Sequence, residues 1–413
     1  MTKVKTDLKS ATRIISGNAT VAWAARYAKV QVISAYPITP QTVIVEKLSD
    51  FVDAGEMDAE YVRVESEHSV MGFLVGASYA GARTFTATAG QGLLYMTEML
   101  HWASATRLPI VTAISDRGIA PPWNIWGDHQ DVIAERDSGW LILFASNHQE
   151  IFDTIIQSYK IAEDPRVFLP IMVCLEGFML SHMNTPVEMP DQAEVDDFLP
   201  EIPQNGWPHI FLDPERPISH GNLQNPGGAT STPGSMYFEF RSLIDEAMIN
   251  SKTVIKEVAE EFKKKFGRYH GALIEEYKCD DAEVALVCMG NLADQAKYSV
   301  DRMRDEGYKV GAVKLRAYKP FPIEDFQNLA KKIKLFALLE RNMGFSLYGG
   351  CASVDLKSAL YYLKERPLVM PVIGGVGGRD VSVDDQCWII KQAFKNLEKG
   401  ELENEVEYVG FHK

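Results

Sequence analysis

The sequence predicts an α/β fold in which a doubly wound, mostly parallel sheet is followed by a second α/β domain. Short apolar runs of strand length alternate with helical segments through the first third of the chain, and the alternation resumes after residue 280. The chain has 413 residues, of which 46% are apolar, so it can bury two or three domain cores.

Each element of the first domain has its own signal. Residues 17–29 are rich in small apolar residues and predict a helix, and residues 30–35 predict a buried strand. Gly72 and Gly76 would let the helix expected at 68–80 pack closely on the sheet. Further strands are expected at 61–64, 84–88, 109–114, 140–145 and 167–175, and further helices at 41–54, 91–106 and 149–162.

The chain changes character between residues 186 and 233, where nine of its twenty prolines fall. Such a segment cannot sustain helices or central strands, so we expect an extended excursion over the surface. A linker and an arm that embraces a partner are both compatible with this pattern.

The second half begins with a long charged helix at 238–266, where apolar residues recur at helical spacing. An α/β unit follows, with strands expected at 283–289, 309–315, 335–340 and 368–373 and helices at 294–306 and 323–332. The predicted organisation is therefore a first domain at 1–185, a proline-rich arm at 186–235, a linker helix at 236–280 and a second domain at 281–413.

Charge and cysteine content exclude several classes of protein. Lys and Arg number 42 and Asp and Glu 56, so the formal net charge is 42 − 56 = −14, which argues against binding nucleic acid or an anionic membrane. The five cysteines are scattered without a CxxC pair, so neither a zinc finger nor a ferredoxin-type cluster can be drawn. With no apolar signal core and no span, we expect a soluble cytoplasmic protein with reduced thiols.

Two polar segments are weak candidates for ligand sites. The turn GGVGGRD at 374–380 lacks GxGxxG spacing, and we interpret it as a tight glycine turn that needs no ligand. Asp128, His129 and Asp131 are metal-ligand types without ligand spacing, so we expect no metal there.

Three loops that each follow a predicted strand are stronger candidates. Thr39 lies in a loop stiffened by Pro37 and Pro40, Glu67 precedes the helix expected at 68–80, and Arg117 could clamp a carboxylate through its planar fork. The alternative for the glutamate is a helix cap. Since strands of one parallel sheet end at the same edge, these loops predict a small-anion site there.

The motifs at these loops resemble the α subunit of 2-oxoacid:ferredoxin oxidoreductases, and the similarity extends over nearly the whole chain. The specific signal is AYPITP at 35–40, ESEHS at 65–69 and NIWGDHQD at 124–131, supported by FTATAGQGL at 85–93 and GGVGGRD. The resemblance implies that the first domain is the pyrimidine-binding half of a thiamine diphosphate site. It also implies that the second domain is similar to the C-terminal domain of transketolase-like enzymes.

Carried over by position, the resemblance assigns roles to five residues. Glu67 is expected to hydrogen-bond the aminopyrimidine ring of the cofactor, which promotes loss of the thiazolium C2 proton. Thr39 and Arg117 are expected to hold the carboxylate and oxo groups of the substrate, and Pro37 and Gly90 to bind the cofactor. Decarboxylation would then follow, with coenzyme A taking the acyl group and electrons leaving singly.

The same resemblance implies partner subunits. The Gly-Asp-Gly motif that binds diphosphate and magnesium is missing, since His129 follows Gly127 and Asp128. In the family that half belongs to the β subunit, and [4Fe-4S] clusters belong to the β and δ-type subunits. We therefore expect a dimer of hetero-oligomers with β, γ and δ-type subunits, active only as a complex, with ferredoxin or another electron acceptor.

Two departures from the pattern of pyruvate enzymes leave the substrate open. Asp116 could pair with Arg117 and weaken the clamp, and Trp123 changes the surface beside the site. Pyruvate is favoured, and an aromatic 2-oxoacid such as phenylglyoxylate or a branched-chain one is the alternative. A non-catalytic scaffold subunit is the alternative of a different class.

Overall fold

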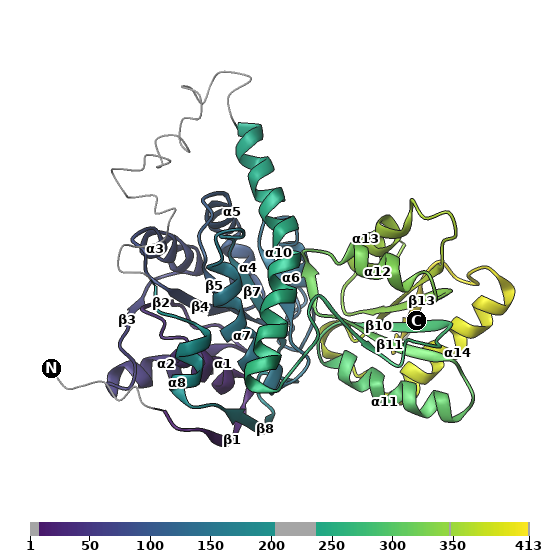
Figure 1. Ribbon diagram of the computed structural model, residues 1–413, viewed down its shortest axis with the longest axis horizontal. Helices are drawn as coiled ribbons and strands as arrows, with labels where there is room; N and C mark the ends of the chain where they lie inside the picture. Colours follow the sequence, from purple (N-terminus) through teal and green to yellow (C-terminus); the bar gives the residue numbers. More distant parts are fainter. Residues whose placement is uncertain (1–7, 203–236, 347, 412–413) are drawn as a thin grey trace.

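Two lobes make up the chain in the computed structural model, which describes residues 8–202, 237–346 and 348–411 (Figure 1). The N-terminal lobe contains a seven-stranded sheet and the C-terminal lobe a six-stranded one. The long helix α10 (Tyr237–Phe266) packs against helices of the first lobe and leads into the second. No helix in the described part of the chain is long and apolar enough to cross a membrane.

The seven-stranded sheet has the order β12-β6-β7-β5-β4-β2-β3, and all neighbours are parallel except β12 with β6. Its strands are β2 (Val32–Ala35), β3 (Glu60–Arg63), β4 (Thr84–Thr88), β5 (Val111–Asp116), β6 (Leu141–Phe144), β7 (Ile171–Glu176) and β12 (Ala317–Lys319). The helices of this lobe are α1 (Gly17–Tyr27), α2 (Thr42–Asp53), α3 (Glu67–Tyr79), α4 (Gln91–Tyr95), α5 (Thr97–Ala105), α6 (Gln130–Ala134) and α7 (His148–Ala162).

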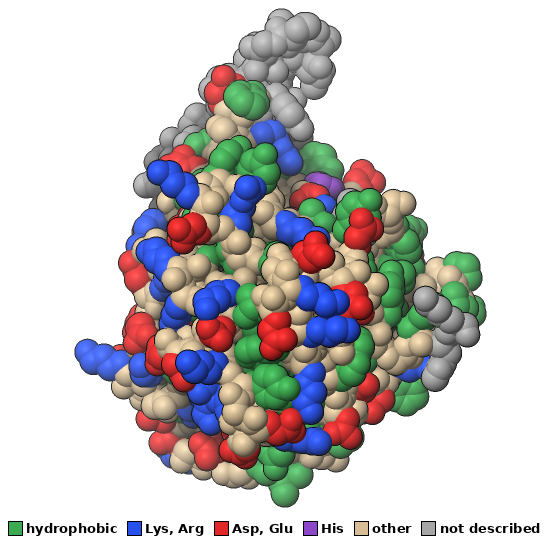
Figure 2. Space-filling view, turned by 90° about the vertical axis from the view of Figure 1, so that its right-hand side faces the viewer, with side chains coloured by type: hydrophobic (Ala, Val, Ile, Leu, Met, Phe, Trp, Pro, Cys, Tyr) green, Lys and Arg blue, Asp and Glu red, His purple; other side chains and the backbone are tan. Residues whose placement is uncertain are grey.

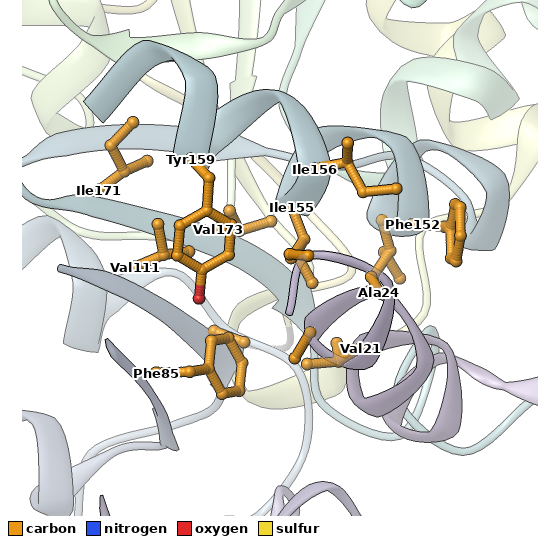
Figure 3. Packing of buried hydrophobic residues seen from close by; sticks show 14 of the residues in the cluster. Val21, Ala24, Phe85, Val111, Phe152, Ile155, Ile156, Tyr159, Ile171 and Val173 are labelled. Carbon is orange, nitrogen blue, oxygen red and sulfur yellow. The ribbon is translucent and has the colours of Figure 1, made fainter. Parts of the chain in front are cut away.

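Helices cover both faces of this sheet, which confirms the predicted fold class. Alternate residues of one strand enter different cores, as in β5, where Val111 packs with α1 and α7 and Ile114 packs with α3 and α5. In the first of these cores, Ile155 and Tyr159 of α7 face the sheet side chains, while Phe152 lies beside Ala24 of α1 (Figure 3). The inner strands β4, β5 and β7 are buried throughout because both faces are covered, whereas the edge strand β3 is partly exposed.

The six-stranded sheet has the order β15-β14-β13-β10-β11-β9, with only β9 antiparallel to its neighbour. Its strands are β9 (Ile274–Tyr277), β10 (Val284–Cys288), β11 (Val310–Leu315), β13 (Leu335–Glu340), β14 (Leu368–Gly374) and β15 (Glu407–Val409). Its helices are α11 (Asn291–Asp305), α12 (Ile323–Leu329), α13 (Cys351–Leu360) and α14 (Val383–Lys399).

The two lobes share structure. Strand β12 comes from the second half of the chain but forms the edge of the first sheet. One apolar core contains both Ile114 of the first sheet and Val313 of the second. On the face of the molecule in Figure 2, acidic and basic side chains are interspersed.

Two segments differ from the sequence-based expectation. The helix expected at 91–106 is two helices that meet at Met96. The Thr97 hydroxyl lies 2.7 Å from the Leu94 carbonyl oxygen and 2.5 Å from Glu135 Oε1, and its single proton is shared between these two acceptors, so a side chain competes for a helical carbonyl where the axis breaks.

The other difference lies at the start of the proline-rich segment. Strand β8 (Asn184–Met189) pairs with β1 (Ala11–Ser16), and helix α8 (Gln192–Phe198) follows Pro190. A proline is tolerated in β8 because this two-stranded sheet leaves one edge of the strand unpaired. Asp191 and Glu194 form a capping box that starts α8. Residues 203–236, the rest of the predicted arm, lie outside the described residues.

Candidate functional site

Four loops meet at one edge of the seven-stranded sheet. Thr39 follows β2, Glu67 follows β3, Gly90 follows β4 and Arg117 follows β5. These strands are parallel neighbours in the order β5-β4-β2-β3, so their carboxyl ends lie at the same edge. In α/β sheets this edge is where ligands bind.

Glu67 is the first residue of α3 and is buried, with 7% of its surface exposed. It is not the cap of the helix, since the Ser66 hydroxyl accepts the Ser69 N–H at 3.2 Å. The carboxylate faces the start of α4: a Cβ built on Gly92 would lie 2.7 Å from Glu67 Oε1 and 2.6 Å from Thr88 Oγ1. The buried Thr88 hydroxyl has no hydrogen-bond partner among the described residues.

Arg117 lies against Gly90. The backbone of Gly90 has φ of 52°, and a Cβ there would lie 2.6 Å from Arg117 Nε, so conformation and space both require glycine. Arg117 Nη1 donates to the Asn124 carbonyl at 3.0 Å, while its buried Nε has no hydrogen-bond partner in the described chain. Burial lowers the pKa of the Arg117 guanidinium, and the nearby Asp131 and Glu67 carboxylates oppose this effect. The structure therefore brings Glu67, Gly90 and Arg117 together.

Asp131 lies beneath these residues and was not predicted to take part in the site. Its Oδ2 accepts the backbone N–H of Gly90 at 2.8 Å and that of Arg117 at 3.1 Å. Burial raises the pKa of Asp131 to about 7, although these backbone hydrogen bonds lower it. Asp131 is the last residue of the NIWGDHQD motif, so the sequence marked it, but the Gly90 and Arg117 amides that it accepts from lie elsewhere in the sequence.

Thr39 and Pro37 are exposed on the loop after β2, in contrast to the buried cluster. The loop is held at Pro40, whose carbonyl accepts the Asn18 amide at 2.7 Å. A Cβ built on Gly177 would lie 2.8 Å from the Asp116 carbonyl oxygen and 2.9 Å from the Pro40 ring, so this loop and the Arg117 loop meet at Gly177. Thr39 is thus placed at the rim of the site.

Asp116 does not weaken the Arg117 clamp in the expected way. Neither of its carboxyl oxygens has a hydrogen-bond partner among the described residues. Burial, together with the neighbouring Asp131 and Glu176 carboxylates, raises the pKa of Asp116 well above its usual range. No hydrogen bond joins the Asp116 side chain to Arg117 among the described residues, so Asp116 is not the counterion of Arg117.

The loop that follows Arg117 docks on the C-terminal lobe. Asp128 Oδ2 accepts the Gly377 N–H at 2.7 Å, and the Asn124 amide donates to the Gly377 carbonyl at 3.0 Å. His129 Nε2 lies 3.2 Å from Glu176 Oε1. The GGVGGRD turn thus packs against this loop, and no group of three or more metal-ligand side chains in the described residues could hold a metal ion.

Aromatic residues flank the Arg117 loop. Trp123 is 81% exposed, whereas Trp126 packs on Phe178 with ring centroids 4.6 Å apart. Trp123 therefore changes the outer surface, as expected, while Trp126 belongs to the contact between loops.

The five cysteines are all buried and unpaired, which agrees with the prediction of free thiols. Burial raises the pKa of every one of them, to about 12 for Cys279. They are therefore protonated thiols in this chain.

Two known families match the sequence. Residues 23–260 match pyruvate flavodoxin/ferredoxin oxidoreductase, thiamine diphosphate-binding, and residues 282–386 match pyruvate:ferredoxin oxidoreductase core domain II. Pyruvate synthase subunit PorA of Pyrococcus abyssi is 48% identical over 403 residues, which cover 97% of this chain and 98% of the relative. Ketoisovalerate oxidoreductase subunit VorA of Pyrococcus horikoshii is 43% identical, with 96% and 97% covered.

Solved structures share the fold. A 2-oxoglutarate:ferredoxin oxidoreductase from Magnetococcus marinus superposes with a TM-score of 0.68 at 19% identity, covering 92% of this chain and 65% of that one. A split gene transketolase superposes with a TM-score of 0.55 at 13% identity, covering 93% and 99%. At these identities the likeness establishes the α/β architecture alone.

Proposed function

This chain belongs to the pyruvate flavodoxin/ferredoxin oxidoreductase family, as its motifs predicted, and on that premise we propose that it is the α-type subunit of a 2-oxoacid oxidoreductase. The reaction converts a 2-oxoacid and coenzyme A into an acyl-coenzyme A and CO₂, releasing a proton and an electron pair. The observation that carries the proposal is the cluster of Glu67, Gly90 and Arg117 at the carboxyl edge of the sheet.

The residues around Gly92 fit the aminopyrimidine ring of thiamine diphosphate. They offer a buried carboxylate, a buried Thr88 hydroxyl without a hydrogen-bond partner among the described residues, and two glycines whose lack of a side chain lets Glu67, Thr88 and Arg117 come close to the backbone. When bound, thiamine diphosphate supplies the electron sink that decarboxylation of a 2-oxoacid requires. Glu67 would accept a hydrogen bond from a ring nitrogen and hold that proton at its carboxylate. Pro37 and Gly90 would complete the contact.

Arg117 would receive the carboxylate of the oxoacid. It is a buried cation whose Nε has no hydrogen-bond partner among the described residues, and a cation in such a site binds a carboxylate strongly because water competes poorly. Thr39, at the rim, would donate its hydroxyl to the same substrate. Asp116 makes no hydrogen bond to Arg117 in the described chain, so the charge of Arg117 is available to the anion.

The remaining components are assigned to partner subunits. This sequence has no diphosphate-binding Gly-Asp-Gly motif, and its buried cysteines are dispersed. We assign magnesium, the diphosphate contacts and the [4Fe-4S] clusters to β and δ-type subunits, with a γ subunit completing the complex in the cytoplasm. The names of the relatives as subunits support an assembly of this kind.

Pyruvate is the favoured substrate, because relatives named pyruvate synthase subunits are 45% to 48% identical over 90% to 97% of the chain. A branched-chain oxoacid is the second candidate, since ketoisovalerate oxidoreductase subunits are 42% to 44% identical. A non-catalytic scaffold is disfavoured by this membership and by the site cluster.

The test is a substrate panel on the complex assembled with its partner subunits. Coenzyme A-dependent reduction of an artificial electron acceptor is measured with pyruvate, 2-oxoisovalerate, 2-oxoglutarate and phenylglyoxylate in parallel. We expect the highest kcat/KM with pyruvate. Preference for 2-oxoisovalerate would select the second candidate, and turnover of phenylglyoxylate alone would contradict both.

A further inference from the structure

Asp131 ties together two loops that leave the sheet side by side. It is fully buried at the start of α6, and its Oδ2 accepts the N–H groups of Gly90 and Arg117 at 2.8 and 3.1 Å. Its Oδ1 accepts the N–H of Val132 at 2.8 Å. One carboxylate oxygen therefore fixes two backbone positions that come from β4 and β5.

These bonds act where the backbone leaves regular structure. Arg117 directly follows β5 and Gly90 lies two residues after the end of β4, so their N–H groups are bonded by a side chain instead of a neighbouring strand. The Arg117 side chain is in turn confined by Gly90, since a Cβ there would lie 2.6 Å from Nε. A shift of either loop would move the guanidinium.

We propose that Asp131 is a positioning residue whose buried carboxylate fixes the place of the Arg117 guanidinium for the incoming oxoacid. The inference rests on the proposed function for the role of Arg117, but the hydrogen bonds from Gly90 and Arg117 to Asp131 are a property of this chain. Asp131 touches neither substrate nor cofactor in this account. It acts through the backbone of Gly90 and Arg117.

The test uses Asp131→Asn in the assembled complex, because asparagine keeps the volume and one acceptor oxygen. Glu135→Gln is the matched control: it replaces another buried carboxylate, at the end of the same helix, whose side chain accepts from Thr97 and contacts neither Gly90 nor Arg117. Hydrogen exchange of the Gly90 and Arg117 amides is measured by mass spectrometry on peptides, and KM and kcat are measured with the preferred oxoacid.

We expect faster exchange at both amides and a rise in oxoacid KM of about tenfold, as for loss of one charge-assisted hydrogen bond in a site. The value of kcat should change less than KM, since substrate binding is what is lost. The control should show neither change. Asp131→Ser, which offers a smaller acceptor, should exceed Asp131→Asn in both effects.

Wild-type exchange and KM in both Asp131 variants would overturn the inference. Arg117→Lys separates this failure from that of the proposed function. If Arg117→Lys leaves KM unchanged, Arg117 does not hold the oxoacid, and exchange alone decides whether Asp131 holds the loops. If Arg117→Lys raises KM while the Asp131 variants do not, only the positioning role is lost.

Discussion

Glycine sets the space around the two charged groups of the site. A side chain at Gly90 would collide with Arg117, and one at Gly92 would collide with Glu67 and Thr88. Gly90 immediately precedes the short helix α4 and Gly92 lies in its first turn, beside the sheet edge. The lack of side chains at these two glycines therefore determines how closely Glu67, Thr88 and Arg117 can approach the backbone.

A Gly90→Ala substitution should therefore have two separate effects, a loss of fold stability and weaker binding of the oxoacid. Forcing alanine into a left-handed backbone costs about 1 to 2 kcal/mol of unfolding free energy. Gly55→Ala is the control, because its φ is also positive, at 65°, while no atom lies within 4 Å of its Cβ position. The temperature of thermal unfolding should be lower in both variants, and the KM for the oxoacid should be raised only by Gly90→Ala. A normal KM for Gly90→Ala would show that this contact is not needed.

At this scale the sequence predicted which residues gather but not how they are held. The loops carrying Glu67 and Arg117 follow parallel strands, and this topology places them at one edge of the sheet. The Asp131 bonds span 41 and 14 positions, and the raised pKa of Asp116 depends on its burial and on carboxylates from other elements. Neither can be inferred from local pattern.

Between elements, a buried ionic cluster joins α7 to β11 and the residue that follows it. Glu150 is fully buried, with Lys314 Nζ 2.9 Å from its Oε2 and Arg316 Nε 3.1 Å from its Oε1. Burial alone would raise the pKa of Glu150, but Lys314, His270 and Arg316 lower it to about 2. The ionised carboxylate therefore stabilises the contact between the two lobes.

Glu150→Gln should lower the unfolding free energy by about 3 kcal/mol near pH 7, because it leaves the buried Arg316 without its carboxylate and Lys314 with Glu275 alone. A depressed carboxyl pKa stabilises the fold above the ordinary value of 4.5 and stops doing so as the pH falls towards 2. The wild-type chain should thus lose stability between pH 4.5 and 2.5 more steeply than the variant. Denaturant unfolding at several pH values measures this difference.

Glu261→Gln is the control for this prediction, since its partner Lys160 lies nearer the surface and its own side chain is 49% exposed. It should change unfolding little at any pH. Equal pH profiles for the wild type and Glu150→Gln would mean that the buried cluster does not stabilise the lobe contact.

Most elements of the parallel sheets were predictable, because strands buried on both faces read as continuous apolar runs. The strands β1, β8, β9, β12 and β15 were not predicted. They are short or half exposed, and their pairing joins segments far apart in the chain, as when Ala317 pairs with Leu143. The contact of Thr97 with Glu135 beside the break at Met96 is also non-local.

The whole molecule consists of two lobes joined by strand β12, which pairs with β6, and by one apolar core with residues from both sheets. Such a unit can hold the Glu67 and Arg117 groups rigidly, but it carries only one half of the proposed cofactor site. Its net charge of −14 argues against nucleic acid binding. Activity is accordingly expected from the complex.

The central claim is that the Glu67 carboxylate hydrogen-bonds a ring nitrogen of thiamine diphosphate and so promotes the proton transfer that decarboxylation requires. The most direct test measures CO₂ release from pyruvate by complexes assembled with the wild-type chain or with Glu67→Ala. We expect coenzyme A-dependent CO₂ release with the wild-type chain and a fall of at least about 100-fold with Glu67→Ala, with the complex still assembled. Release at the wild-type rate by the assembled Glu67→Ala complex would contradict the account.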